Sequence, residues 1–477
     1  MTTLYARLAA IGLAASLTAC VAAPPPEVAT PVPELPATYT FAANAQDAAS
    51  LDALLPSEDA GFVALSTAAL DKSPTLLEAM ARVEAARAGA RRAGAERLPN
   101  FGVDASVTEN RINPNQFGSN NPIAQAIDTT QVSYGANITA RWDADLFGQL
   151  KAQERAAIAR IDAATASASA VRLALLSEIA ASVVDWRALD ARTSAIESDV
   201  AAAMRLAALA KTREDAGIAP GFDRVRAEAQ ASASRSRLAA LESERARLLG
   251  RLVTLTSLDG NEVAAALALP TKASAPGAAP ASLPSELLAN RPDVLAAAAQ
   301  LAASDAELAA TARSRFPRLT LSGVLGLLSF SPSNFFDEDS LVRTLTAGVA
   351  APLLDFGRIE AEIDGAAAGK KVAFQAYRGA VFQALGDAEA AYGLVAAADE
   401  QAALAAQERD ELERAASLAD DRYRAGLASF LEVLEARRAA DSSGERAAAA
   451  LAAAQRARII LWQALGGDAS ELADNAA

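Results

Sequence analysis

The sequence of 477 residues contains no histidine and a single cysteine, Cys20. Without histidine the chain lacks the commonest general base and metal ligand, and one cysteine cannot form a disulfide framework. We therefore expect neither an enzyme nor a protein with a metal or other cofactor. Aromatic residues make up only 5% of the chain, whereas hydrophobic residues, many of them alanine, make up 52%. Such a composition favours helix, because alanine loses no side-chain entropy on becoming helical.

The charge balance is acidic, with a formal net charge of −14. This argues against a nucleic-acid partner, which would require a basic face on the protein. Two interpretations of the acidic balance remain open. It reflects either a solvated acidic surface or an acidic, water-filled lumen that favours cations.

The N-terminal segment has the features of a secretion signal. A short apolar run, Leu8 to Leu17, follows Arg7 and ends in Leu17-Thr18-Ala19-Cys20. This ending is similar to the lipobox of bacterial lipoproteins, which implies a signal peptide at 1–19 and a lipidated Cys20; the alternative is a signal peptide with a chance cysteine. A proline-rich tether follows at 20–47 and cannot be helical. Beyond the signal no run of 18 apolar residues occurs, so we expect no membrane-spanning helix.

The rest of the chain contains one pattern written twice. The interval from Pro74 to Pro99 equals the interval from Pro292 to Pro317. Similarly, Gly217 follows Phe147 at the same distance at which Gly426 follows Phe356. Because chance does not readily supply several landmarks at constant spacing, we infer an internal duplication.

Each copy predicts the same order of elements. A helix opens with the first proline, and alternating apolar and polar residues after the second proline predict a β-hairpin. Next comes a helix of about 66 residues, which would be ~100 Å long and must pack along neighbours. We expect the first repeat at 48–257 (hairpin about 100–146, long helix pair about 148–257), an equatorial segment at 258–290, the second repeat at 291–465 (hairpin about 318–354, long helix pair about 357–465) and a tail at 466–477.

The strand count bears on the oligomeric state. Two hairpins supply four strands per chain, whereas the smallest single-chain outer-membrane barrels have eight. An open sheet leaves unpaired edges, which are costly in lipid, so four strands could close a barrel only by oligomerising. Three chains would give twelve strands. The alternative is a soluble sheet domain on a coiled-coil stalk.

Four motifs, in order along the chain, resemble signatures of one family. Trp142 to Gln149 resembles the W-x-x-D-L-F-G-[RQ] stretch of TolC-like outer-membrane factors, in particular the OprM/NodT-type lipoproteins of tripartite efflux pumps. Three further stretches, Arg291 to Val294, Pro352 to Arg358 and Tyr423 to Ser429, are similar to other signatures of that family. The resemblance covers essentially the whole mature chain.

This resemblance implies a mainly α fold with β, in which a trimeric twelve-stranded outer-membrane barrel continues into a periplasmic α-helical barrel. It implies an equatorial belt from the segments before Ser73, between Leu258 and Asn290 and after Gly466. The implied partners are two further copies of the chain, outer-membrane lipid, a periplasmic adaptor protein and an inner-membrane pump of the resistance-nodulation-division class. The implied function is a passive exit duct for drugs or other small molecules. Alternatives are a duct for type I protein secretion and a non-transporting structural lipoprotein.

The resemblance also implies a periplasmic gate after the second glycine turn. Glu432 and Glu435 are three residues apart and share a helix face. They match the acidic positions of the family's V-D-V-L-D-A constriction, and Leu431 and Arg438 match two further constriction positions. Close carboxylates raise one another's pKa and attract cations. The alternative for this stretch is a solvated helix face near a turn.

The two glycine turns are the remaining candidate sites. Gly217 and Gly426 allow sharp turns, and the apolar residues that follow them, Ile218 and Leu427, are expected to dock the adaptor because exposed apolar tips favour being covered. The first copy has Asp223 and Arg226 where the second has its gate residues, and we expect ion pairs between the helices to hold the tips shut.

Overall fold

The computed structural model describes residues 26–42, 45, 50–111, 113, 130–218, 220–271 and 277–467. The predicted lipidation site Cys20 and nearly all of the loop after the first strand lie outside these residues. The described chain is mostly helical with one small antiparallel sheet, which confirms the predicted fold class. It forms two compact units, which are described separately below.

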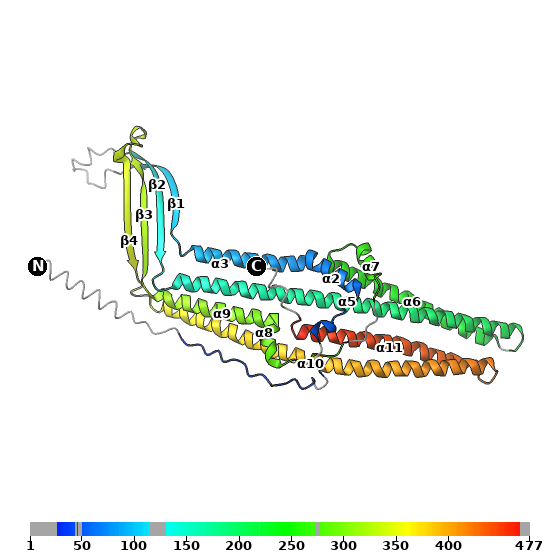
Figure 1. The fold of residues 1–477 in the computed structure, drawn as a ribbon. Helices are drawn as coiled ribbons and strands as arrows, with labels where there is room; N and C mark the ends of the chain where they lie inside the picture. Colours follow the sequence, from blue (N-terminus) through cyan, green and yellow to red (C-terminus); the bar gives the residue numbers. More distant parts are fainter. Residues whose placement is uncertain are drawn as a thin grey trace. The chain divides into compact units, whose positions relative to one another are not determined.

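The first unit contains the sheet (Figure 1). Its strands are β1 (Asn100–Arg111), β2 (Thr130–Ala144), β3 (Arg318–Ser329) and β4 (Leu341–Ala350). All neighbouring pairs are antiparallel and the order is β1-β2-β3-β4, so β1 and β4 are the edges. Apolar side chains cross the whole sheet in register, as in the row Ala105, Ala136, Leu327 and Leu341.

Each hairpin is preceded by a helix that opens with proline, as predicted. These are α3 (Pro74–Ala95) and α9 (Pro292–Ala312), the latter extended by a 3₁₀ turn, η4 (Arg313–Arg315). Proline is harmless in a first helical turn because its missing N–H would have no partner there. In the second hairpin the strands are joined through two 3₁₀ turns, η5 (Pro332–Asn334) and η6 (Glu338–Ser340).

The second unit holds most of two very long helices. These are α5 (Gln149–Asp215) and α10 (Arg358–Arg424), each of 67 residues, in agreement with the expected length. Two shorter helices, α6 (Gly221–Thr256) and α11 (Phe430–Ala464), turn back and run beside them (Figure 1). No proline interrupts either long helix, and their faces pack against neighbours rather than closing a globular core.

Shorter elements wrap the middle of the second unit. They are η1 (Leu51–Leu54), α2 (Ala60–Lys72), α7 (Gly260–Leu267), η3 (Pro284–Glu286) and α8 (Leu287–Asn290). Leu65 of α2 and Val263 of α7 are fully buried in one cluster with Ile179 of α5 and Leu252 of α6. We refer to these short elements, packed on the long helices, as the belt.

One helix of the described chain is long and apolar enough to cross a membrane by length and composition alone. An 18-residue window of α5 has a mean hydropathy of 1.5, although 44% of that window is buried within the protein. The sequence contains no continuous apolar run of that length. The window nevertheless has a high mean hydropathy because alanines stand between its polar residues.

Candidate functional site

The first of the two predicted tips is a Schellman turn. α5 ends at Asp215, after which the N–H of Gly217 donates to the carbonyl of Glu214 at 2.8 Å and the N–H of Ile218 donates to the carbonyl of Arg213 at 2.8 Å. Gly217 has φ of 70°, a left-handed conformation that glycine adopts without a side-chain clash. The chain then enters α6.

The second tip repeats this geometry. Gly426 has φ of 77°, and the N–H of Leu427 donates to the carbonyl of Arg422 at 2.7 Å. The residues after the two glycines are exposed, Ile218 to 69% and Leu427 to 70%. Sequence and structure therefore agree that each tip presents one large apolar side chain to its surroundings.

The four predicted gate residues are exposed on α11 immediately after the second tip. They are Leu431, Glu432, Glu435 and Arg438. Between them along the helix, Val433 and Leu434 are buried in a cluster with Leu206 of α5. Neither Glu435 nor Arg438 has an ion-pair partner in the described part of the chain. Both side chains are exposed in the single chain.

Glu432 has a structural task that the sequence analysis did not assign. Its carboxylate accepts the backbone N–H of Ser429 at 2.7 Å, and the Ser429 hydroxyl accepts the N–H of Glu432 at 3.2 Å. This is a capping box, which satisfies two of the free donors at the start of α11. The Ser-x-x-Glu pattern was visible in the sequence and would have predicted it.

The expected ion pairs of Asp223 and Arg226 are not formed within the described residues of one chain. Arg226 instead lies over the ring of Phe222, 4.4 Å from its centroid. The links between helices near the tips are made by other residues. Arg437 of α11 contacts Asp420 of α10 at 3.2 Å.

Aromatic packing also joins the helices at the tips. Tyr423 and Phe430, on either side of the second turn, meet edge to face with ring centroids 6.0 Å apart. Arg213, near the end of α5, lies over the Tyr423 ring at 4.6 Å. The last turn of α5 is thereby tied to the last turn of α10, a contact between residues far apart in the sequence.

A small hollow of about 130 Å³ lies in the same region, between α5, α6, α10 and α11. Asp199 and Asp441 both line it. The basic and acidic groups that act on the pair are Arg237 of α6 and Arg437 and Glu445 of α11. Sequence reasoning missed this carboxyl pair because its members lie on different helices.

Two of the family motifs cap the long helices. The Asp145 carboxylate accepts the N–H of Leu150 at 3.1 Å and that of Lys151 at 2.8 Å. In the second copy Asp355 accepts the N–H of Ile359 at 2.9 Å, and this bond lowers the pKa of Asp355. Helix N-termini favour such anionic acceptors, so the aspartates of these motifs are structural.

The Arg-Pro-Asp motif is a buried clamp. Arg291, only 8% exposed, donates to Asp293 at 3.0 and 2.6 Å, to Asp387 of α10 at 3.0 Å and to the carbonyl of Ala464 at 3.1 Å. One guanidinium thus joins the start of α9 to α10 and to the end of α11. Its planar fork suits this task, since it offers five N–H donors.

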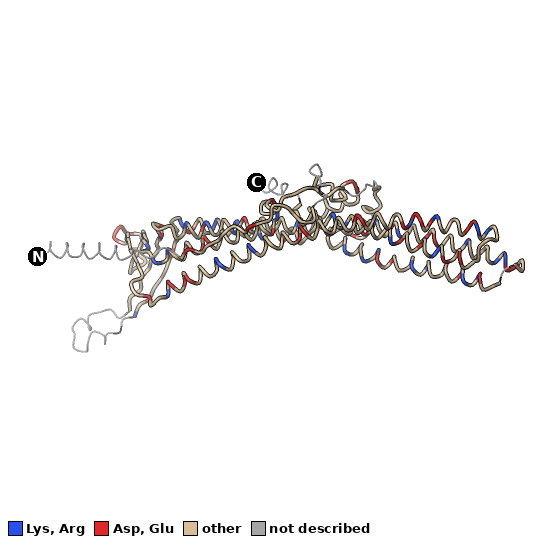
Figure 2. Tube along the Cα trace, turned by 90° about the horizontal axis from the view of Figure 1, so that it is seen from below, with Lys and Arg blue, Asp and Glu red and all other residues tan. Residues whose placement is uncertain are grey.

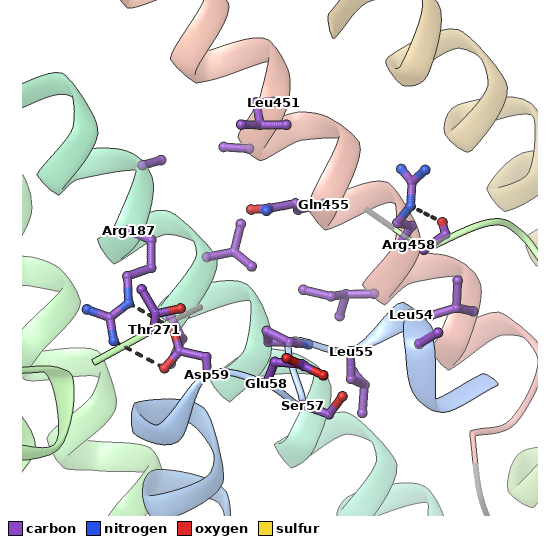
Figure 3. A pocket seen from close by; sticks show the side chains of 18 of the residues that line it. Leu54, Leu55, Ser57, Glu58, Asp59, Arg187, Thr271, Leu451, Gln455 and Arg458 are labelled. Atoms are coloured by element: carbon purple, nitrogen blue, oxygen red, sulfur yellow. Dashed lines mark hydrogen bonds and ion pairs between the residues drawn. The ribbon is translucent and has the colours of Figure 1, made fainter. Parts of the chain in front are cut away.

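A larger hollow of about 560 Å³ lies among the belt elements (Figure 3). Near one end Asp59 receives Arg187 at 2.8 Å and also caps α2 through the N–H of Gly61. Near the other, Arg458 donates to the carbonyl of Gly277 at 2.6 Å and pairs with Asp399. These pairs fasten the short segments to α5 and α11, and the lining between them is largely apolar.

Charges of both signs are interspersed along the long helices (Figure 2). The net charge of −14 is accordingly spread over the chain. No group of three or more His, Cys, Asp or Glu residues in the described ranges could hold a metal ion.

Comparison with known proteins identifies the family. The sequence model described as "Outer membrane efflux protein" matches residues 65–260 and 283–467. The chain is 30% identical over 401 residues to the pyoverdine export outer membrane protein OpmQ of Pseudomonas putida, covering 84% of each protein. It is 29% identical to the outer membrane protein OprJ of Pseudomonas aeruginosa, covering 96% of this chain and 95% of OprJ.

Solved structures agree with the sequence comparison. The outer-membrane channel OprN superposes with a TM-score of 0.83 and 25% identity, over 93% of this chain and 99% of OprN. Proteins of this family form homotrimeric channels that work with periplasmic adaptors and inner-membrane pumps in tripartite efflux systems. The family is one of outer-membrane channels and not of enzymes. The chain belongs to the outer membrane efflux protein family.

Proposed function

We propose that three copies of this chain form the passive exit duct of an efflux system, and that α11 carries the gate at its periplasmic end. The duct has no catalytic activity of its own and passes drugs or other small molecules that a pump and an adaptor deliver. The observation that carries the gate proposal is the exposed face of α11, on which Glu435 and Arg438 have no ion-pair partner among the described residues, whereas Val433 and Leu434 are buried.

Three-fold repetition of this face supports a selective constriction. Two glutamates per chain place six carboxylates around one axis in a trimer, and rings of acidic side chains favour cations. Glu435 is exposed and has no ion-pair partner among the described residues. Glu432 is held by Ser429, so it contributes charge from a fixed position.

Conductance in planar bilayers tests the gate. We expect Glu435→Gln to reduce cation selectivity and change the closed-state conductance, and Glu432→Gln to reduce selectivity while keeping the helix cap, since glutamine also serves in capping boxes. The matched control is Glu400→Gln, which removes an exposed carboxyl from a different helix, α10. Unchanged selectivity and conductance in both gate variants would refute the gate.

The tips are proposed to bind the adaptor. Ile218 and Leu427 are exposed apolar residues held at sharp turns, and covering such residues is favourable. A photo-crosslinker at position 427 should capture the adaptor in cells. The same probe at Leu404, which is 60% exposed on α10, is the control. Equal capture of the adaptor at both positions would contradict a specific contact between the tips and the adaptor.

Lipidation at Cys20 is proposed from the lipobox-like ending of the signal segment. The wild-type protein should incorporate labelled palmitate, and Cys20→Ser should not. Labelling that survives in Cys20→Ser would contradict the assignment, since the chain has no second cysteine.

A further inference from the structure

We propose that the hollow of about 560 Å³ among the belt elements, called the belt hollow below, is a binding site for an organic cation with an apolar body. Glu58 accepts the positive charge, and the apolar floor of the hollow takes the body. All the residues that line the belt hollow belong to one chain. The site therefore goes beyond the proposed duct and does not depend on its gate.

The belt hollow has the size and the lining of a ligand pocket. Pockets for small molecules usually measure about 300–1,000 Å³ and are lined mainly by apolar side chains. The floor of the belt hollow contains buried apolar side chains, among them Val183 of α5 and Ile459 of α11. Leu54 of η1 and Leu55, the residue after it, line another side. An apolar body placed here leaves water, which is favourable.

Small residues keep this space free between two long helices. Ala188 of α5 lines the hollow, and so do Ala448 and Ala452 of α11, which lie about one helical turn apart. A larger side chain at any of these positions would fill part of the space. Leu451 also lines the hollow and is 47% exposed in the single chain, so the hollow opens to the surface.

The arginine at one end of the hollow is already satisfied by the protein. Arg187 donates to both carboxylate oxygens of Asp59, at 2.8 and 3.1 Å. It also donates to the carbonyl of Leu267 at 2.7 Å and to that of Leu269 at 3.3 Å. Its charge is therefore compensated by Asp59, and most of its N–H donors are occupied.

The arginine at the other end is occupied in the same way. Arg458 donates to the two carboxylate oxygens of Asp399 at 2.7 and 2.9 Å. It also donates to the carbonyls of Gly277 and Ala454, at 2.6 and 2.9 Å. Neither arginine is left to attract an anion, and both fix the walls of the hollow in place.

The charge that remains is that of Glu58. Its carboxylate is exposed and has no ion-pair or hydrogen-bond partner among the described residues (Figure 3). Gln455 of α11 is half-buried in the lining, and its amide likewise has no hydrogen-bond partner in the described part of the chain. The lining thus combines an apolar floor with one uncompensated negative charge. A cation complements this charge, and an anion does not.

Tetraphenylphosphonium tests the site, because its phenyl rings surround a single positive charge. Tetraphenylborate is the matched probe, since it has the same shape and the opposite charge. Isothermal titration calorimetry of the full-length trimer in mild detergent measures the binding of each ion. Micelles take up both ions without saturating, so binding in the hollow is the saturable part. We expect the parent to bind tetraphenylphosphonium saturably and more tightly than tetraphenylborate.

Variants that fill the hollow test its position. Ala448→Phe fills it from α11 and Ala188→Phe fills it from α5, so each should remove the saturable binding of tetraphenylphosphonium. The matched control is Ala449→Phe, at an exposed neighbouring position outside the lining, which should bind as the parent does. Thermal melting identifies which variants are folded. Equal saturable binding in the parent and in a folded filled variant would overturn the site. A parent trimer without saturable binding, as when a neighbouring subunit fills the hollow, would overturn it too.

Glu58→Gln tests the charge of the ligand. Binding of tetraphenylphosphonium should weaken by roughly two- to five-fold, the range for an exposed ion pair, and binding of tetraphenylborate should not weaken. Glu400→Gln, which removes an exposed carboxyl outside the lining, should change neither. The hollow would be a site for apolar molecules of any charge if Glu58→Gln bound both ions as the parent does. That result, or a parent that prefers tetraphenylborate, would overturn the proposal of a cation site.

Discussion

Asp199 of α5 lies against Asp441 of α11 in the wall of a small hollow among four helices. Burial, and then the neighbouring Asp441 carboxyl, raise the pKa of Asp199 to about 7, and burial raises the pKa of Asp441 as well. Oδ2 of Asp199 is buried without a hydrogen-bond partner among the described residues. A proton on one of the two carboxyls supplies the missing bond.

This pair should make packing of α5 on α11 sensitive to pH. Since the folded-state pKa of Asp199 is raised from 3.8 to about 7, the folded protein keeps a proton between those values that the unfolded chain has released. The stability that comes with this proton is present at low pH and is lost as pH rises toward 7. The melting temperature of the wild type should therefore fall between pH 5 and pH 8.

Asp199→Asn should flatten that pH dependence, because asparagine stays uncharged and can donate to Asp441. At pH 8 we expect the melting temperature of the variant to exceed that of the wild type by roughly 2–4 °C per kcal/mol of stabilisation. At pH 5 we expect the two melting temperatures to be nearly equal. Glu197→Gln, which removes an exposed carboxyl on the same helix, should leave the profile unchanged. Parallel profiles for wild type and Asp199→Asn would contradict this account.

Replacing Arg291 by alanine should lower the stability of the folded protein strongly. Arg291→Ala removes the donor to the carbonyl of Ala464, and losing the partner of a buried polar group costs about 1–3 kcal/mol. It also breaks the ion pairs with Asp293 and Asp387. Thermal denaturation should show a large drop. Arg82→Ala removes an exposed pair with Glu78 and should cost under about 1 kcal/mol. Comparable losses in the two variants would contradict the clamp.

Two glycines of the second repeat should respond to alanine with opposite signs. Gly426 has φ of 77°, and a side chain in this conformation costs about 1–2 kcal/mol. Gly444 lies within α11 with no heavy atom near its added Cβ, so Gly444→Ala should stabilise by about 0.5–1 kcal/mol. Chemical denaturation of both variants tests this. No change in Gly426→Ala would argue against the turn geometry, and destabilisation by Gly444→Ala would argue against open space beside that helical residue.

Local signals allowed much of the fold to be predicted. Pro74 and Pro292 mark helix starts because their ring restricts φ, and Gly217 and Gly426 mark turns because other residues rarely adopt positive φ. The capping role of Glu432 was also encoded locally, in its spacing from Ser429.

Contacts between distant residues were beyond sequence reasoning. Nothing near Arg291 in the sequence indicates Asp387 as its partner, since their proximity depends on how α9 packs on α10. The same holds for Asp199 and Asp441, which come from different repeats. Their charges would be expected to face solvent until the helices are placed side by side.

The relatives favour a role in efflux over a role in protein secretion. OprJ and OpmQ, for example, are outer-membrane proteins of the efflux family. What each relative exports belongs to that relative.

The central claim is that copies of this chain enclose a water-filled axis. Mass measurement of the purified full-length protein in mild detergent, followed by single-channel recording in planar bilayers of the same sample, tests it most directly. We predict a trimer that gives discrete, cation-favouring conductance steps. A monomer that never passes ions under these conditions would contradict the account.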